Sequence, residues 1–127
     1  MSNRAIVSTP DAPAAIGPYS QAVKVGNTVW LSGQIPLMPN NTELVPGDIT
    51  AQATQAFRNL AAVAEAAGGS LKNAVKINIS LTDLEHFGAV NVVMAQFFQE
   101  PFPARACVQV AALPKGAQIE IEAILVL

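Results

Sequence analysis

Two charged side chains near the carboxyl end of the chain are the first candidates for chemistry. Residues 104–110 and 118–127 each alternate between polar and apolar side chains, as β-strands with one buried face do. If both apolar sides pack on one core, Arg105, Cys107 and Glu120 share the outer face of a sheet. An arginine there can clamp a carboxylate through two parallel hydrogen bonds, and a glutamate can take a proton from water.

Structural explanations of the same residues stay open at this point. An interfacial salt bridge between Arg105 and Glu120 accounts for the pattern without any chemistry, and the pattern alone favours it. Cys107 is more typical of a small buried side chain than of a nucleophile, because no histidine stands near it in the sequence. Tyr19 follows three prolines and is either a hydroxyl at the site or an anchor in the core. His86 is more typical of a solvent-facing or capping residue than of a catalytic one.

The composition excludes several kinds of site. The 127 residues contain one cysteine and one histidine, which excludes a disulfide within the chain, a cysteine cluster for zinc and a His-rich metal site. A Ser-His-Asp triad would depend entirely on His86. Gly68 and Gly69 follow a helical pattern and do not open one, so no glycine-rich phosphate loop is visible. We therefore expect no metal and no cofactor.

The charge pattern bears on partners and location. Seven Lys and Arg against nine Asp and Glu give a net charge of -2, so nucleic acid is a poor candidate partner. Charged residues are only 13% of the chain, whereas roughly 25% is typical, which predicts a surface hidden in a subunit interface. No apolar run reaches the roughly 18 residues of a membrane helix. Residues 1–15 lack the apolar core of a signal peptide, so we expect a cytoplasmic protein without a membrane partner.

Periodicity and turn residues predict the elements that position these side chains. Strands are expected at residues 4–7, 74–81, 104–110 and 118–127, a hairpin at 22–25 and 28–33, helices at 48–67 and 83–99, and a surface loop at 35–47. In the strand 74–81, Val75 should share one apolar face with Ile77, Ile79 and Leu81. The turn at 113–116 should pair the last two strands antiparallel.

The element order predicts the architecture. A single domain of residues 1–127 is expected to form an α+β fold, with both helices on one face of a mixed, mainly antiparallel sheet. The other face of the sheet would then be bare, which again indicates a second subunit.

Several separated motifs resemble the RidA family of reactive intermediate deaminases, also known as the YjgF family. The motifs are AAIGPYSQA at residues 14–22, SGQIP at 32–36, EAAGG at 65–69, FPAR at 102–105, LPKG at 113–116 and IEIEA at 119–123. The resemblance implies a chorismate-mutase-like fold and a homotrimer, with a central β-barrel and clefts between subunits. It also implies hydrolysis of 2-iminopropanoate and 2-iminobutanoate to 2-oxo acids and ammonia, without a metal or cofactor.

The resemblance also implies roles for individual residues. Arg105 matches the family's carboxylate-binding arginine and Glu120 the acid that positions or activates water. Further substrate-binding positions are matched by Tyr19, Gly33, Asn91 and Cys107, with Ser32 a weaker candidate. Three alternatives stay open. The first is a non-catalytic module that binds 2-oxo acids, and the second is deamination of other amino compounds by the same fold. The third is RNA cleavage or translation inhibition, against which the net charge of -2 and the presence of only three arginines argue.

Overall fold

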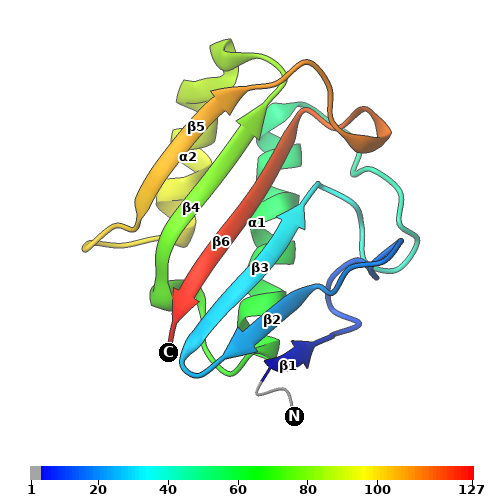
Figure 1. The fold of residues 1–127 in the computed structure, drawn as a ribbon. Helices are drawn as coiled ribbons and strands as arrows, with labels where there is room; N and C mark the ends of the chain where they lie inside the picture. The colour runs from blue at the N-terminus through cyan, green and yellow to red at the C-terminus, as the bar shows by residue number, and fades with distance from the viewer. Residues whose placement is uncertain (1–3) are drawn as a thin grey trace.

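The computed structural model describes residues 4–127 as one six-stranded sheet with two α-helices packed on one of its faces (Figure 1). The elements are β1 (Arg4–Val7), β2 (Ala22–Val25), β3 (Thr28–Gln34), α1 (Ile49–Ala66), β4 (Ala74–Leu81), α2 (Phe87–Phe97), β5 (Ala104–Gln109) and β6 (Ile119–Val126). Short 3-10 turns precede β4, α2 and β6. The strand order is β1-β2-β3-β6-β4-β5, so the mixed sheet with both helices on one side is confirmed.

The helix α1 begins and ends where the sequence predicts. Asp48 caps it, because its carboxylate accepts a hydrogen bond of 3.1 Å from the backbone N–H of Ala51. The chain turns away at Gly68, which has a φ of 97° that favours glycine. Phe57, Leu60 and Val63 on its inner face are fully buried against the sheet and α2.

The second helix is shorter than the predicted span 83–99. Asp83 caps a 3-10 turn at Leu84–His86, and α2 runs only from Phe87 to Phe97. Phe98 has extended backbone angles and places its buried ring edge-on to Phe57, with 5.9 Å between the ring centroids. The helix therefore ends at the residue whose ring packs on Phe57, before the predicted boundary at Pro101.

The predicted pairing of the last two strands is wrong. β6 pairs antiparallel with β3 and β4, whereas β5 pairs parallel with β4 at the edge of the sheet. The chain crosses from β4 to β5 through α2, and a helical crossover of this kind returns a parallel strand. β6 therefore enters on the other side of β4, and the turn at 113–116 spans the end of that strand instead of closing a hairpin (Figure 1).

The strand β4 departs from the prediction at one residue. Ala74 pairs with Leu125 and Lys76 with Ile124, so Val75 is the extra residue of a β-bulge and is 47% exposed. The predicted inner face is confirmed for the remaining apolar residues of the strand, which are at most 1% exposed: Ile77, Ile79 and Leu81. Neither α-helix in the described part of the chain has the length and hydropathy that a membrane crossing requires.

Candidate functional site

The register of β5 places Arg105 on the face of the sheet that the helices cover. Arg105 pairs with Ile77 and Cys107 with Ile79, and both isoleucines are buried under the helices. Glu120 pairs with Ser80, which belongs to the opposite face of β4. The prediction that Arg105, Cys107 and Glu120 share the outer face is therefore wrong.

The reason lies in the edge position of β5. An edge strand keeps both of its faces partly accessible, so polar residues do not mark its solvent side. Val108 points to the outer face of the sheet and is 52% exposed, whereas Arg105 extends under the sheet toward α2. Polar and apolar residues do alternate along β5, but the apolar residues point to the bare face of the sheet.

Side chains of α2 fix the guanidinium of Arg105. Its Nη1 donates a hydrogen bond to Oδ1 of Asn91 and lies 3.7 Å from the sulfur of Met94. The guanidinium carbon lies 5.0 Å from the centroid of the Phe87 ring, which is a cation–π geometry. These contacts within residues 4–127 are all to neutral groups, and the guanidinium forms no salt bridge with Glu120 of the same chain. The alternative of a salt bridge across a subunit interface stays open.

A cavity of about 490 Å³ opens beside this arginine. Its lining includes Asn91, Met94 and Arg105, together with Phe102 and Pro103 just before β5. Phe102 is 58% exposed, so the cavity has an apolar rim next to a positive charge. The arrangement suits a small anion with a short apolar part.

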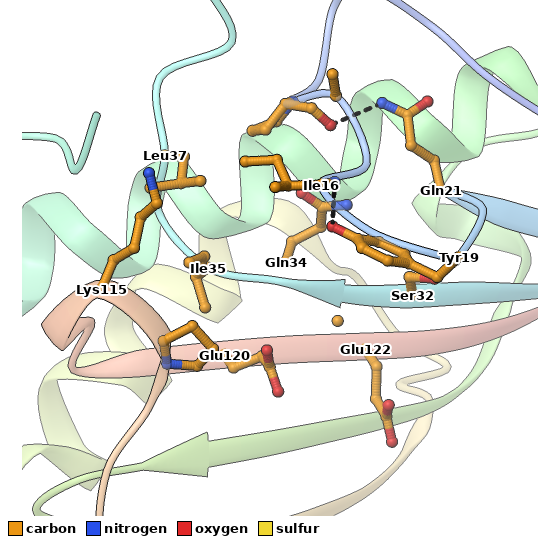
Figure 2. A pocket seen from close by; sticks show the side chains of 14 residues that line it. Ile16, Tyr19, Gln21, Ser32, Gln34, Ile35, Leu37, Lys115, Glu120 and Glu122 are labelled. Carbon is orange, nitrogen blue, oxygen red and sulfur yellow. Dashed lines mark hydrogen bonds between the residues drawn. The ribbon is translucent and has the colours of Figure 1, made fainter. Parts of the chain in front are cut away.

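A second cavity, of about 570 Å³, lies on the other face of the sheet around Glu120 (Figure 2). Its walls come from the loop before β2, the end of β3, the turn before β6 and β6 itself. Tyr19, Ser32, Gly33 and Glu120 line it, so the structure brings four of the expected residues together here. The remaining candidates, Arg105, Asn91 and Cys107, belong to the opposite face.

Gly33 and Glu120 fit against each other without room for a side chain at residue 33. The register between β3 and β6 shifts between Leu31 and Gln34, so Gly33 lies in a β-bulge. A Cβ atom on Gly33 would stand 2.8 Å from Cδ of Glu120, closer than carbon atoms approach. A side chain at residue 33 would therefore displace the Glu120 carboxyl group from its place over the backbone.

Tyr19 lies at the cavity and not in the core, which decides between its two interpretations. The side chain is 51% exposed, and its Oη accepts a hydrogen bond of 3.3 Å from the backbone N–H of Ile16 (Figure 2). Ser32 lies below the ring and donates a hydrogen bond of 2.5 Å to the carbonyl of Ser20. The loop before β2 is thus tied to β3 and forms one wall of the cavity.

The cavity contains residues that the sequence analysis did not select. Glu122, two positions after Glu120 in β6, faces the same side, and strand periodicity contained that signal. Lys115 lines the rim with a positive φ of 58°, which its residue type does not indicate. The walls also include the apolar side chains of Ile16, Ile35 and Leu37.

A profile of the family described as endoribonuclease L-PSP matches residues 9–127. The chain belongs to this family, which is the RidA or YjgF family. A RidA-family relative from the mite Dermatophagoides farinae, named 2-iminobutanoate/2-iminopropanoate deaminase, is 54% identical over 127 residues and covers 100% of this chain and 99% of its own. The human protein of the same name is 49% identical over 121 residues, with 95% and 88% covered.

Solved structures of RidA-family proteins share the fold. RidA from an Antarctic Psychrobacter bacterium is 56% identical, has a TM-score of 0.94, and matches over 97% of this chain and 99% of its own. TdcF from Escherichia coli, crystallised with bound serine, is 45% identical with a TM-score of 0.92, over 97% and 98% of the two chains.

The electrostatics of the site distinguish its two candidate reactive groups. Burial raises the pKa of the Glu120 carboxyl above its ordinary value, and the neighbouring Glu122 raises it further. A carboxylate with a raised pKa is a better proton acceptor at neutral pH than an ordinary one. Within residues 4–127 no group of three His, Cys, Asp or Glu residues lies close enough together to hold a metal ion.

Cys107 has the surroundings of a structural cysteine. It packs against the buried core from β5, and burial raises the pKa of its thiol, an effect that Arg105 opposes only in part. The thiolate is the nucleophilic form, and a raised pKa makes it scarce. The structure therefore favours the interpretation of Cys107 as a small half-buried side chain beside Arg105.

Proposed function

We propose that this chain is a 2-iminobutanoate/2-iminopropanoate deaminase, which hydrolyses these imino acids to 2-oxo acids and ammonia. The mite and human relatives, about half identical over nearly their whole length, carry this name. The observation that carries the proposal is the Glu120 carboxyl, which is held in a cavity against Gly33 with a raised pKa. It is suited to accept a proton from a water molecule.

The active site forms between copies of the chain. A 2-imino acid is small, and one chain holds Arg105 and Glu120 on opposite faces of its sheet. A second copy that presents its β5–α2 edge to the Glu120 cavity brings the two residues to one substrate. The assembly is a homotrimer, in which three sheets enclose a central barrel and three clefts lie between subunits.

The bare face of the sheet supports such an assembly. Four large apolar side chains on it are each at least 45% exposed: Ile6, Trp30, Val108 and Val126. Exposed apolar surface of this extent, in a chain with only 13% charged residues, favours burial against another subunit. Exposed Phe102 continues the apolar surface to the edge beside Arg105.

The geometry supports a hydrolysis in two steps. Arg105, held by Asn91 and Phe87, binds the substrate carboxylate through its remaining N–H groups and orients the imine. Glu120 takes a proton from water as the oxygen attacks the imine carbon, and passes this proton to the nitrogen, which gives a tetrahedral adduct with a hydroxyl and an amino group. The hydroxyl proton is then transferred through Glu120 to the amino group, the C–N bond breaks, ammonia leaves and the 2-oxo acid remains. Tyr19, Ser32 and Gly33 form the wall around Glu120, and Cys107 packs against the core two residues after Arg105 in β5.

A coupled assay tests the function. A threonine or serine dehydratase releases the imine, and the protein should speed its decay to the 2-oxo acid and ammonia. A protein that binds 2-oxobutanoate but leaves the decay rate unchanged would be the binding module instead. Cleavage of RNA without imine hydrolysis would likewise contradict the proposal. The cytoplasmic location expected from the sequence stays a prediction.

A further inference from the structure

Buried amide side chains in this molecule gather around the walls of the Glu120 cavity. The buried polar residues among 4–127 are Gln21, Gln34, Gln52 and Asn59. Gln21 and Gln34 line the cavity directly. Gln52 and Asn59 do not line it, but they stand seven residues apart on α1, about two turns, and so share the helix face that packs on the sheet. A buried amide in a core requires partners, and the partners of these two residues are informative.

Asn59 is 1% exposed and uses its side chain to hold the segment that follows β3. Its Nδ2 donates hydrogen bonds to the carbonyl of Leu37 at 2.9 Å and to that of Ile35 at 3.3 Å. Its Oδ1 accepts a bond of 2.9 Å from Nε2 of Gln55, which fixes the orientation of the amide. Ile35 and Leu37 also line the cavity, so a side chain of the helix layer holds the part of the cavity wall that lies just beyond the end of β3.

Gln52 makes the corresponding contact with the strand that carries the acid. Its Oε1 accepts a hydrogen bond of 2.9 Å from the backbone N–H of Gln118, immediately before β6. Gln118 stands two residues before Glu120. The helix α1 thus holds the end of β3 with a donor and the start of β6 with an acceptor.

The two contacts flank the bulge that sets Gly33 against Glu120. β3 and β6 lose their regular pairing between Leu31 and Gln34, so the ladder alone does not fix the backbone there. The hydrogen bonds from Asn59 to Ile35 and from Gln118 to Gln52 hold the backbone on either side of the bulge, where strand pairing does not. Displacement of a reacting group by about 1 Å can cost 10²-fold in rate, so this support matters for chemistry.

We propose that Asn59, assisted by Gln52, is a positioning residue that holds the Glu120 carboxyl over Gly33 in its reactive place. It touches neither the substrate nor the reacting atoms, and acts through the backbone at residues 35–37. The inference rests on the proposed function for its effect on rate, but its effect on the surroundings of Glu120 is independent of that function.

The test compares Asn59→Ala with a matched control, Asn73→Ala. Asn73 also bonds backbone groups, the N–H of Ser70 and the carbonyl of Val126, but at the opposite end of β6. Each variant is checked for thermal stability, for the Glu120 carboxyl pKa by carbon-13 NMR titration, and for kcat and KM with the imino acid. The NMR titration needs no enzymatic activity.

Asn59→Ala should move the pKa of Glu120 toward its ordinary value and lower kcat by about tenfold or more. KM should change little, because the substitution does not alter Arg105, which binds the substrate carboxylate. Asn73→Ala should lower stability without either effect. An Asn59→Ala protein that is folded, with an unchanged Glu120 pKa and kcat, would overturn the proposal.

Two further outcomes are distinguishable. If Asn59→Ala does not fold, Gln52→Ala removes only the contact to Gln118 and must produce the same pKa shift and loss of kcat, or the proposal fails. If the unchanged protein has no imine hydrolysis, the proposed function fails, while a variant-dependent pKa of Glu120 would still support the positioning role.

Discussion

Arg105 and Glu120 point to opposite faces of one sheet, because Arg105 pairs with Ile77 and Glu120 with Ser80, and these two residues of β4 face opposite ways. One face is covered by the helices and the other is bare (Figure 1). The two residues therefore belong to separate cavities of the same chain. A site that uses both for a substrate of a few atoms needs two copies of the chain.

Replacement of Arg105 by lysine should lower kcat/KM for imine hydrolysis by about 10²-fold while the fold survives. Lysine keeps the positive charge but cannot present two parallel donors to a carboxylate. It also lacks the planar guanidinium that lies over the Phe87 ring. Steady-state kinetics and circular dichroism on the same preparation check this. Turnover at the rate of the unchanged protein would exclude the clamp.

Glu120→Gln should separate binding from chemistry. Glutamine keeps the shape but cannot accept the proton, so hydrolysis should fall by about 10² or more while 2-oxobutanoate still binds. Thermal unfolding of the assembled variant is measured as well, because loss of a counter-charge for the neighbouring subunit's Arg105 would lower stability, whereas loss of the general base alone would not. Calorimetric titration with 2-oxobutanoate beside the kinetic assay is the measurement, and a fully active variant would eliminate the general base.

The raised pKa of Glu120 predicts the pH dependence of both rate and stability. The base must be ionised, so kcat should rise with pH through a pKa above the ordinary value of 4.5. The folded protein holds this proton more tightly than the unfolded chain. The protonated Glu120 carboxyl therefore contributes to the free energy of unfolding at low pH, and this contribution is lost as pH rises through the folded pKa. The stability of Glu120→Gln, compared with that of the unchanged protein at the same pH, should be higher at neutral pH than at pH values below 4.5. Urea unfolding of both proteins at several pH values checks the sign, and the opposite trend would refute it.

Gly33→Ala should lower activity because the new methyl group would collide with the Glu120 carboxyl, where the distance would be only 2.8 Å to Cδ. Gly88→Ala is the matched control, since nothing lies within 4 Å of a Cβ built there and residue 88 is in a helix. It should keep full activity and gain about 0.5–1 kcal/mol of stability. Equal kinetics of the two variants would show that the contact at Gly33 is unimportant.

Cys107→Ser should keep activity of the same order as the unchanged protein. The thiol has a raised pKa because it is buried, and a reaction driven by activated water needs no thiolate. Kinetics and mass spectrometry during turnover provide the test. Complete loss in a correctly assembled protein, or a covalent adduct on Cys107, would establish a nucleophilic mechanism.

The sequence predicts most of the fold because its local signals agree with the tertiary structure. The Asp48 cap and Gly68 bound α1, and Gly26 with Asn27 turns the hairpin between β2 and β3. The position of β5 was not predictable in the same way. Nothing local in residues 104–109 shows that β6 inserts between β4 and β3, or that β5 is an edge strand whose polar residues face the helices.

The sequence motifs selected residues that the structure brings together, but they did not predict the geometry of the candidate site, and the roles of the residues stay predictions. Motifs identified Tyr19, Gly33 and Glu120, and the structure places these three around one cavity. The separation of Arg105 from Glu120 depends on strand register, which alternation alone does not determine for an edge strand. The hydrogen bonds of Asn59 could not be predicted, because a single asparagine in an amphipathic helix does not indicate which carbonyl groups it will bond.

The most direct measurement is complementation between two inactive variants. Arg105→Ala and Glu120→Gln are unfolded together, mixed and refolded, and light scattering verifies a mass three times the 13.2 kDa of one chain. If each cleft takes Arg105 from one subunit and Glu120 from its neighbour, every mixed trimer contains one intact cleft, and imine hydrolysis should reappear although neither variant alone has it. A mixture that stays as inactive as its components, with mixed trimers shown to be present, would contradict an active site shared between subunits.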